Sequence, residues 1–600
     1  MQNRYQPHDT NQKTRPDGTV ILRSNHVMSQ VAPSSGAWLH QWAAAAGDRV
    51  FLAERSGAEW RSETYVSCLE KTRALAAGLL ARGFDAGSPI MILSGNGVDH
   101  GLLTLAAQYI GVPSVPVAEQ YSLIEGAHGR LAEVVQLIRP KAVFVDNADR
   151  YAKAITLDIF ENTEIFASDP GAQKVTPIAE LLAQGSNGDV DAAFAKVTPD
   201  TVAKILMTSG STSTPKGVLT TQRMMCTNQA QIADALPFLR ARPPRIVDWL
   251  PWNHVFGGSH NFNMMLANGG SLYIDDGKPV AGLFDRTVEN LGLITGTLAF
   301  NVPVGFALLL DALRADTTLA RRFFAELDMI FYAGASLPQD IWSGLESLAK
   351  AAGGEMPLVT SSWGLTETAP AAIMQHEPPH QSGIVGVPLN DVEAKLIPLE
   401  EGRYEVRVKG PNIMRSYFNA PQKTRESFDD EGYFLTGDAM CFVDPADANK
   451  GLRFDGRISE DFKLATGTWV RAANLRLEML ACLAPYAADV VITGHDRGEI
   501  GLLVFPNRAA WAGMDIIDDG DCLSGAALIK ALLRPLKLRA AQVSGSSNRI
   551  ARAIVASEAA QIAEGEITAK GNLNFRKILT RRKHIVERLY NDADPAVIKL

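Results

Sequence analysis

The residues best suited to chemistry in this sequence form one small polar segment, TSGSTSTPKG at 208–217. It follows an apolar run, AKILM, and ends with Lys216 and a glycine. Hydroxyl groups and exposed backbone N–H groups are what the oxygens of a polyphosphate need, and a lysine adds positive charge. The lysine precedes the glycine, whereas a Walker A loop has the order Gly-Lys-Ser/Thr. The segment therefore predicts a phosphate-binding loop of another kind, with a solvated Ser/Thr-rich linker as the alternative.

Four further residues are candidates, and each also has a structural explanation. Asp438 follows Thr-Gly and fits a turn, while Glu367 follows Thr366 and fits the first turn of a helix, where the dipole favours a carboxylate. Lys570 lies in a polar stretch, as solvated lysines commonly do. His254 stands among aromatic residues in LPWNHVFG, where a lone histidine is most often part of the core. No one of these residues identifies a site by itself.

Short apolar runs bounded by Gly, Pro or Asp predict the strands that position these residues. They alternate with stretches whose apolar residues recur every three or four positions, as over 35–83, which is typical of helices. The alternation predicts an α/β domain with a mainly parallel sheet. After about residue 384 the pattern has a period of two, which predicts an antiparallel β subdomain, and beyond Gly456 we expect a small α+β domain. The runs include PIMILS, GVPSVPV, KAVFVD, AKILMTS, IVDWLP, SLYID, MIFYAG, VEAKLIPL, YEVRVKG, ADVVITG and IGLLVF.

Composition excludes several classes of protein. The 600 residues are 46% hydrophobic and 21% charged, which excludes a disordered chain, a collagen-like fibre and a disulfide mini-scaffold. With 58 Lys plus Arg against 66 Asp plus Glu, the net charge of −8 gives no general attraction for nucleic acid or an anionic membrane. The five cysteines have no paired spacing, and no run approaches the about 18 apolar residues of a membrane span. We expect a cytoplasmic protein with reduced thiols and neither a signal peptide nor a membrane span.

The chain resembles the adenylate-forming acyl-CoA synthetase superfamily in five motifs that occur in that superfamily's order. The segment 208–217 is the first. The others are WGLTE at 363–367, YFLTGD at 433–438, Gly456-Arg457 followed by Lys463, and TAKG at 568–571. Within the superfamily the chain looks most like feruloyl-CoA synthetases, in DWLPWNHVFGGSHNFNM, NGGSLYIDDGKP, RPDGTVILRS and GEITAKGNLN. The resemblance covers nearly the whole chain.

The resemblance implies an enzyme that joins CoA to a carboxylic acid through an acyl-adenylate, with ATP, Mg²⁺ and CoA as cofactors and co-substrates. It assigns Thr366 to the α-phosphate, Glu367 to Mg²⁺, and Asp438 and Arg457 to the ribose hydroxyls. Trp363 would stack on adenine, opposite the backbone of Gly334 and Ala335. The β- and γ-phosphates would be held by the loop residues Thr208, Ser209, Gly210, Ser211, Thr212 and Lys216.

For the acyl half of the site, the resemblance assigns His254 as a gate at the carboxylate end of the pocket. Lys570 would bridge the substrate carboxylate and the α-phosphate during adenylation, and Gly467 would border the CoA tunnel. The expected pocket lining consists of Trp252, Asn261, Met264, Gly334 and Gly364. Flat aromatic and soft methionine walls suit a planar hydroxycinnamate such as ferulate, and they also suit an aliphatic chain.

The implied fold is α/β: a large N-terminal domain of parallel αβ subdomains plus a β subdomain, with a small mobile α+β C-terminal domain. We expect a polar arm over 1–34, an adenylation domain over 35–457 and a mobile lid over 458–600 that carries Lys570. A medium-chain fatty acid or simple aryl acid as substrate, a carrier protein as acceptor, and a binding protein on an inactive scaffold are the alternatives. The expected partners are the acid, ATP and CoA, with no nucleic acid, and a homodimer is compatible with the sequence.

Overall fold

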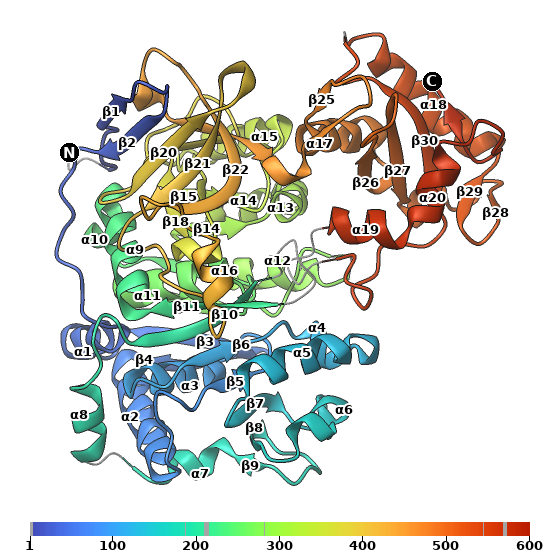
Figure 1. The fold of residues 1–600 in the computed structure, drawn as a ribbon. Helices are drawn as coiled ribbons and strands as arrows, with labels where there is room; N and C mark the ends of the chain where they lie inside the picture. The colour runs from blue at the N-terminus through green and yellow to red at the C-terminus, as the bar shows by residue number, and fades with distance from the viewer. Residues whose placement is uncertain (1–3, 186–187, 209–214, 281, 544, 568–572) are drawn as a thin grey trace. The chain divides into compact units, whose positions relative to one another are not determined.

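The computed structural model describes residues 4–185, 188–208, 215–280, 282–543, 545–567 and 573–600 (Figure 1). The chain divides into two compact units. Unit 1 comprises residues 1–398, 406–436 and 442–454, and unit 2 comprises residues 399–405, 437–441 and 455–600. The chain therefore passes between the two units several times before it continues into the C-terminal part of unit 2.

A seven-stranded sheet of unit 1 positions the predicted phosphate loop. Its order is β11-β10-β6-β5-β7-β8-β9, and every neighbouring pair is parallel except β10 and β11. The predicted parallel α/β architecture is thus present here. The strands are β5 (Ile90–Ile92), β6 (Ser114–Pro116), β7 (Ala142–Asn147), β8 (Glu164–Asp169), β9 (Thr176–Pro177), β10 (Val202–Thr208) and β11 (Lys216–Thr221).

Two smaller sheets of unit 1 are also largely parallel. One has the order β12-β13-β3-β4 and the other β14-β15-β16. Strands β3 and β4 pair in antiparallel fashion and interrupt the residues 35–83 that were predicted to be helical, because the short apolar run VFLA at the start of β3 is mostly buried in a sheet. The strands are β3 (Val50–Ser56), β4 (Glu59–Thr64), β12 (Arg245–Asp248), β13 (Ser271–Ile274), β14 (Leu298–Asn301), β15 (Met329–Tyr332) and β16 (Leu358–Thr360).

Helices of unit 1 begin where the sequence offers caps. Thr64 and Thr221 each accept a hydrogen bond from a backbone N–H of the helix that follows, α2 and α9. The longer helices are α1 (Ser35–Ala45), α2 (Tyr65–Ala81), α3 (Val98–Tyr109), α5 (His128–Ile138), α9 (Gln222–Ala235), α12 (Phe284–Leu293), α13 (Pro303–Ala315), α14 (Thr317–Phe324) and α15 (Gln339–Ala352). The shorter ones are α4 (Gln120–Leu123), α6 (Ala152–Ile155), α7 (Ile178–Leu182), α8 (Gly188–Phe194), α10 (Phe238–Ala241), α11 (Phe262–Ala267) and α16 (Pro421–Arg425).

A nine-stranded sheet contains the predicted antiparallel region. Its order is β1-β2-β20-β21-β22-β23-β19-β18-β17. Strands β1 and β2 lie within the predicted polar arm, and residues 10–24 are not loosely packed: Val20, Ile21 and Leu22 are buried, and β2 pairs with β20. The strands are β1 (Thr10–Thr14), β2 (Val20–Ser24), β17 (Ser362–Gly364), β18 (Ala371–Met374), β19 (Ile384–Pro388), β20 (Glu393–Pro398), β21 (Arg403–Lys409), β22 (Phe434–Phe442) and β23 (Leu452–Arg457).

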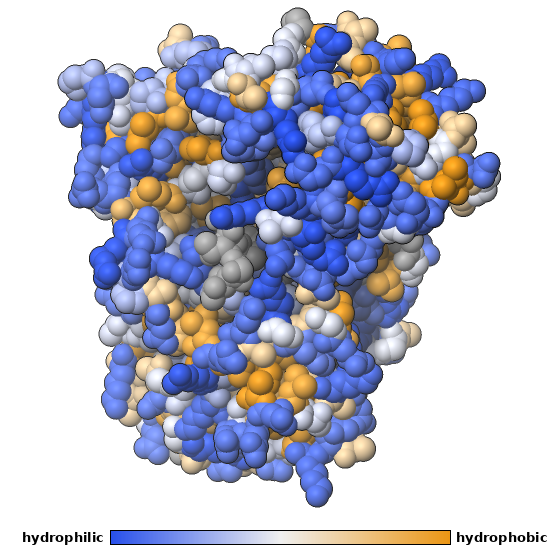
Figure 2. Space-filling model, turned by 45° about the vertical axis from the view of Figure 1, so that its right-hand side comes forward, coloured by the Kyte–Doolittle hydropathy of each residue, from blue (hydrophilic) through white to orange (hydrophobic). Residues whose placement is uncertain are grey.

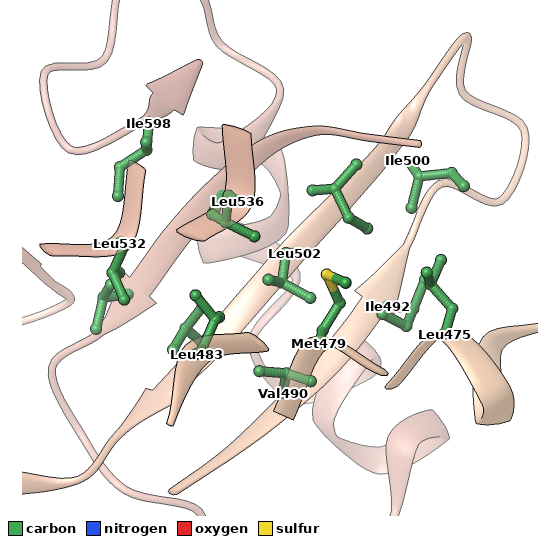
Figure 3. Close-up of a cluster of buried hydrophobic side chains, with 14 of the residues drawn as sticks. Leu475, Met479, Leu483, Val490, Ile492, Ile500, Leu502, Leu532, Leu536 and Ile598 are labelled. Atoms are coloured by element: carbon green, nitrogen blue, oxygen red, sulfur yellow. The ribbon is translucent and has the colours of Figure 1, made fainter. Parts of the chain in front are cut away.

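Unit 2 has its own sheet and hydrophobic core. The sheet order is β26-β27-β30-β29-β28, with β31 beside β30. Figure 3 shows leucine and methionine side chains of α17 and α18 packed against β26 and β27, which explains how this small α+β unit buries an apolar face. Its elements are β24 (Phe462–Lys463), β25 (Trp469–Val470), α17 (Ala472–Leu483), β26 (Ala487–Thr493), β27 (Ile500–Pro506), β28 (Ile517–Asp518), β29 (Cys522–Ser524), α18 (Ala526–Ala540), β30 (Ile550–Ala556), α19 (Phe575–Arg581), α20 (Lys583–Leu589) and β31 (Ile598–Lys599).

The surface agrees with the balanced composition. On the face drawn in Figure 2, hydrophilic residues predominate and apolar residues occur in small separate groups. All five cysteines are free. Among the described residues, no helix is long and apolar enough to cross a membrane.

Candidate active site

The hairpin formed by β10 and β11 holds both ends of the predicted phosphate loop. The antiparallel ladder extends to Thr208, which pairs with Lys216. Lys216 is half-buried, and its Nζ lies 5.0 Å from the ring centroid of Tyr417. Two of the predicted phosphate ligands are therefore neighbours at one end of the hairpin. The other loop residues named above, Ser209, Gly210, Ser211 and Thr212, lie outside the described residues.

Tyr417 connects Lys216 to the predicted metal ligand Glu367. Its hydroxyl group donates a hydrogen bond to Glu367 Oε1 at 2.9 Å, and the backbone N–H of Met414 donates to the Glu367 carbonyl oxygen at 2.8 Å. Burial and then the charge of Glu367 raise the pKa of Tyr417, so the hydroxyl keeps its proton and remains a donor. The Tyr417 side chain thus contacts both Lys216, a predicted phosphate ligand, and Glu367, the predicted metal ligand. No local pattern in the sequence marks Tyr417 as a site residue.

Replacing Tyr417 by phenylalanine tests this connection. Tyr417→Phe keeps the ring beside Lys216 and removes a hydrogen bond to a charged group, a contact worth about 1.5–3 kcal/mol. We expect the KM for ATP in the presence of Mg²⁺ to rise about 10-fold, because the Glu367 carboxylate loses the contact that orients it. Pyrophosphate release against ATP concentration measures the change. Tyr273→Phe, on β13, is the control, and an unchanged KM in Tyr417→Phe would contradict the role.

The predicted residues Trp363, Gly364, Thr366 and Glu367 lie at the end of β17 and on the turn that follows it: Trp363 and Gly364 belong to β17, and Thr366 and Glu367 to the turn Thr366–Thr368. A Cβ atom on Gly364 would come within 1.7 Å of the Pro370 carbonyl oxygen, so only glycine fits there. The backbone N–H of Leu365 donates to Thr368 Oγ1 at 2.7 Å, which closes the turn. Trp363 and Thr366 are buried, whereas Glu367 is half-buried. These contacts fix the backbone conformation of the residues that are predicted to bind the nucleotide.

Gly334 and Ala335 follow β15 at the edge of the three-stranded parallel sheet. The backbone N–H of Ala333 donates to the Asn301 carbonyl oxygen at 3.3 Å, which joins the carboxyl ends of β14 and β15. Gly334 has a φ of +87°, a conformation that favours glycine. Strand β16 ends at Thr360, just before β17, the strand that carries Trp363. Because carboxyl ends of neighbouring parallel strands meet at one edge, this edge is a natural ligand-binding position.

His254 precedes a π-helix, Phe256–Asn261, which leads into α11. Its Nδ1 accepts a hydrogen bond from the backbone N–H of Phe256 at 3.2 Å, and its carbonyl oxygen accepts one from Gly258 at 2.9 Å. His254 is half-buried and stays a candidate gate. π-Helical turns frequently occur at functional sites.

Trp252, Asn261 and Met264, which were predicted to line the acyl pocket, are all buried. Trp252 packs edge-on against His100 and Phe262, at 5.0 Å between ring centroids in each case, and lines a cavity of about 10 Å³. Asn261 and Met264 are fully buried and do not line this cavity. The cavity has room for about one water molecule.

Asn261 instead forms a buried relay with Asp248 and His260. Its Nδ2 donates to Asp248 Oδ2 at 2.9 Å, and its Oδ1 lies 2.9 Å from His260 Nδ1. The three residues are 1%, 0% and 1% exposed, for Asp248, Asn261 and His260 respectively. Burial raises the pKa of Asp248 to about 7 and lowers that of His260 to about 4. The histidine ring is therefore neutral at physiological pH.

Lys204 is a buried cation that the sequence reasoning missed, although a lysine inside the apolar run AKILM was a visible signal. It lies on β10, is 3% exposed, and its Nζ donates to the Gly258 carbonyl oxygen of the π-helix. Within the described part of the chain it forms no ion pair with a carboxylate, and burial lowers its pKa to about 7. Lys204 thus links the strand that enters the phosphate loop to the helix that follows His254.

The charge of Lys204 predicts a pH-dependent stability. Unfolding returns the pKa from about 7 towards its ordinary value of 10.5, so the unfolded chain binds more protons between these values and the wild type gains stability as pH rises through them. Lys204→Met carries no buried charge, so its free energy of unfolding relative to wild type should be highest near pH 6 and fall towards pH 9.

Denaturant unfolding at several pH values measures this difference. His100, the other titratable group that faces Lys204 in the cavity, has a pKa lowered to about 4 by burial and does not titrate in this range. Lys350→Met, on the exposed face of α15, is the control. A difference that does not vary with pH would show that Lys204 keeps its ordinary pKa and its charge in the folded state.

Unit 2 contains the predicted ribose ligands and the predicted CoA residue. Asp438, 3% exposed, lies on β22, and Arg457 Nε is 3.7 Å from its Oδ1. The Arg457 side chain is 58% exposed, so this pair combines a buried carboxylate with an accessible cation. Gly467, with a φ of +84°, lies in the turn between β24 and β25. Lys570 lies outside the described residues.

Comparison with known proteins identifies the family. Residues 39–418 match the family described as AMP-binding enzyme. The chain belongs to this family. Related sequences include 4-coumarate–CoA ligase 5 of Oryza sativa subsp. japonica, 26% identical over 487 residues that cover 79% of this chain and 84% of the ligase. Luciferin 4-monooxygenase of Photinus pyralis is 26% identical over 482 residues, 76% of this chain and 82% of that protein.

Solved structures agree with the family's fold. O-Succinylbenzoate coenzyme A synthetase from Bacillus subtilis, in complex with AMP, has a TM-score of 0.66 at 19% identity and covers 92% of this chain and 98% of its own. The adenylation domain of a carboxylate reductase from Mycobacterium chelonae has a TM-score of 0.70 at 18% identity, over 94% of this chain and 92% of its own. The predicted acyl-adenylate-forming fold is confirmed, as is the expectation of an enzyme of the adenylate-forming group.

Proposed function

We propose that this AMP-binding enzyme is an acid–thiol ligase that joins CoA to a hydroxycinnamic acid such as ferulate. The observation that carries the proposal is Tyr417, which holds Lys216 and Glu367 at the end of the hairpin that bounds the predicted phosphate loop. A cation and a carboxylate in this position suit a site where phosphate oxygens and Mg²⁺ meet. The family match and the 4-coumarate–CoA ligase relative support a route through an acyl-adenylate.

The chemistry explains why positive charge must be local. A free carboxylate is a poor acyl donor because its leaving group would be oxide. Attack of the carboxylate oxygen on the α-phosphorus of ATP breaks the bond to pyrophosphate, and AMP then leaves when the CoA thiolate attacks the acyl carbon. Two anions meet in the first step, so their repulsion must be offset. In a chain of net charge −8, we assign this task to Lys216, Arg457 and Lys570.

The residues fit a magnesium ion that enters with the nucleotide. Across the described residues, no group of three or more His, Cys, Asp and Glu side chains could hold a metal ion. Mg²⁺ typically binds one or two carboxylates together with water and substrate phosphates. Glu367 would supply the carboxylate, with Tyr417 orienting it. When bound, the ion supplies positive charge beside the phosphates.

The remaining assignments come from the resemblance to the superfamily, and the burial and position of these residues are compatible with them. Thr366 is a hydroxyl donor for the α-phosphate on the same turn as Glu367. The buried Asp438 carboxylate can accept hydrogen bonds from both ribose hydroxyls, with Arg457 beside it. Trp363 and the Gly334–Ala335 backbone would enclose adenine. These roles remain part of the proposal.

We assign the exchange between adenylation and thioester formation to movement of the C-terminal domain over 458–600. This segment carries Lys570 for the first half-reaction and Gly467, at the predicted CoA tunnel, for the second. Adenylation and thioester formation act on the same acyl group, and each step needs its own residues near the acyl carbon. A mobile domain that carries both residues meets that requirement.

A panel of acids tests the proposal. Pyrophosphate release and thioester absorbance are measured with ATP, CoA and each of ferulate, 4-coumarate, benzoate and octanoate. We expect the highest kcat/KM with the hydroxycinnamates. A preference for octanoate or benzoate would overturn the assignment of a hydroxycinnamate as substrate, but not the assignment of ligase activity. Pyrophosphate release without a CoA thioester would favour a carrier-protein acceptor, and nucleotide binding without pyrophosphate release on any acid would favour a binding protein.

A further inference from the structure

When Asp248 is ionised, above its pKa of about 7, the buried relay Asp248–Asn261–His260 fixes which nitrogen of His260 carries its proton. The Asp248 carboxylate accepts from the Asn261 amide nitrogen at 2.9 Å and from the backbone N–H of Leu250 at 3.2 Å. The Asn261 carbonyl oxygen is therefore the atom that faces His260 Nδ1, at 2.9 Å. An amide oxygen can only accept, so Nδ1 is the protonated nitrogen. In the neutral ring, Nε2 is left as an acceptor.

This acceptor is buried without a described hydrogen-bond partner. His260 Nε2 has no exposed surface and no partner among the described residues. The ring is surrounded by Phe256, Phe300 and Phe331, at centroid distances of 5.6, 5.6 and 5.1 Å. Buried polar atoms in folded proteins are nearly always paired, and one that is not has a cost of about 1–3 kcal/mol. A polar atom kept in an aromatic cluster points to a ligand that supplies the missing donor.

The cluster lies at the candidate acyl site. His260 and Phe256 are on the π-helix that begins two residues after His254. Phe300 and Phe331 are on β14 and β15, whose carboxyl ends lead to Val302 and to Gly334. The histidine is thus placed among flat apolar rings, close to where the proposed acid would bind.

We infer that His260 is a specificity-determining residue, whose Nε2 accepts a hydrogen bond from the phenolic hydroxyl of the acid. The inference rests on the proposed function and deepens it, because it selects among aromatic acids. A phenol can donate to Nε2. A methyl ether, an unsubstituted ring or an alkyl chain cannot, and each would leave the acceptor unpaired when water is displaced. Sites built to pair a substrate hydroxyl discriminate strongly against analogues that lack it.

The test compares 4-hydroxycinnamate with cinnamate in the full-length enzyme. We expect wild type to show a kcat/KM ratio of about 10- to 100-fold in favour of the hydroxylated acid. His260→Leu should bring this ratio to within about 3-fold, chiefly by lowering activity with 4-hydroxycinnamate. The matched control is His100→Leu, which removes another buried histidine, one that lines the cavity beside Lys204, and should keep the wild-type ratio.

Wild type alone provides a second test that does not depend on the folding of a variant. 4-Aminocinnamate, which can donate, should be used well, whereas 4-fluorocinnamate, of similar size but without a donor, should be used as poorly as cinnamate. A wild-type enzyme that does not distinguish the donor acids from the others, or a His260→Leu variant that keeps the ratio, would overturn the inference while leaving the ligase assignment intact. If wild type adenylates no cinnamate at all, the proposed substrate class is wrong and the inference falls with it.

Discussion

Lys570→Ala is expected to lower the rate of acyl-adenylate formation by about 100- to 1,000-fold, the effect of removing one group that stabilises developing charge. The lysine is assigned to bridge the substrate carboxylate and the α-phosphate, so its loss leaves the repulsion between two anions uncompensated. The second half-reaction does not need it. Formation of feruloyl-CoA from chemically supplied feruloyl-adenylate should therefore continue near the wild-type rate. Pyrophosphate release measures the first step, and thioester absorbance measures the second.

A matched lysine in the same domain separates this effect from a general change of charge. Lys537 is exposed on α18, and Lys537→Ala should leave both half-reactions unchanged. If Lys570→Ala released pyrophosphate from ferulate and ATP at the wild-type rate, the assignment of the lysine would be wrong. Equal loss in both half-reactions would instead indicate damage to the domain.

Glu566→Ala is expected to destabilise unit 2 by about 3–5 kcal/mol, the range for removing one partner of a buried ion pair. The Glu566 side chain has no exposed surface, and both its oxygens accept hydrogen bonds from Arg582, at 2.7 Å each. The backbone N–H of Asn574 also donates to the Glu566 carbonyl oxygen at 2.8 Å, and Ile567 bridges to Leu573. The substitution would leave the Arg582 charge buried beside the two ends of the segment that carries Lys570.

Denaturant unfolding followed by tryptophan fluorescence measures the loss, since Trp469 and Trp511 lie in unit 2. Glu558 also approaches Arg582, at 3.6 Å, but is 51% exposed, so Glu558→Ala should cost less than about 1 kcal/mol. Burial alone would raise the pKa of Glu566, but the Arg582 hydrogen bonds outweigh it and lower that pKa. The stabilisation is therefore present above the ordinary carboxyl pKa and is lost as pH falls through the lowered value. Equal stability of Glu566→Ala and wild type at neutral pH would refute the pair's importance.

Residues that belong to contiguous motifs were predictable from the sequence. PIMILS and KAVFVD became β5 and β7 because a short apolar run between turn residues has few alternatives to a buried strand. Trp363, Gly364, Thr366 and Glu367 are found together on β17 and the turn after it because they are adjacent in the chain. The pairing of Thr208 with Lys216 was not foreseen, since the sequence between them shows only a polar loop.

Residues that depend on long-range contacts were not predictable in this way. Tyr417 meets Glu367 across 50 residues of chain, and no local pattern marks either partner for the other. The burial of Lys204 depends on the π-helix that supplies its acceptor, and the hairpin of β1 and β2 depends on β20. Asn261 and Met264 were predicted to line the acyl pocket, and that role stays a prediction; their complete burial depends on packing that the sequence does not show. Tertiary contacts of this kind override local propensity.

The relay behind His260 has a consequence for how substrate preference evolves. An imidazole nitrogen is a donor when it holds the proton and an acceptor when it does not. In His260 the hydrogen bonds of Asp248 and Asn261 determine which nitrogen is protonated, although neither residue is one of the phenylalanines around the histidine. A substitution of Asp248 or Asn261 during evolution can therefore change whether His260 Nε2 is a donor or an acceptor, while the phenylalanines around His260 stay the same. Family members that share every aromatic residue around His260 can differ in the acids they accept, and positions 248 and 261 would record the difference.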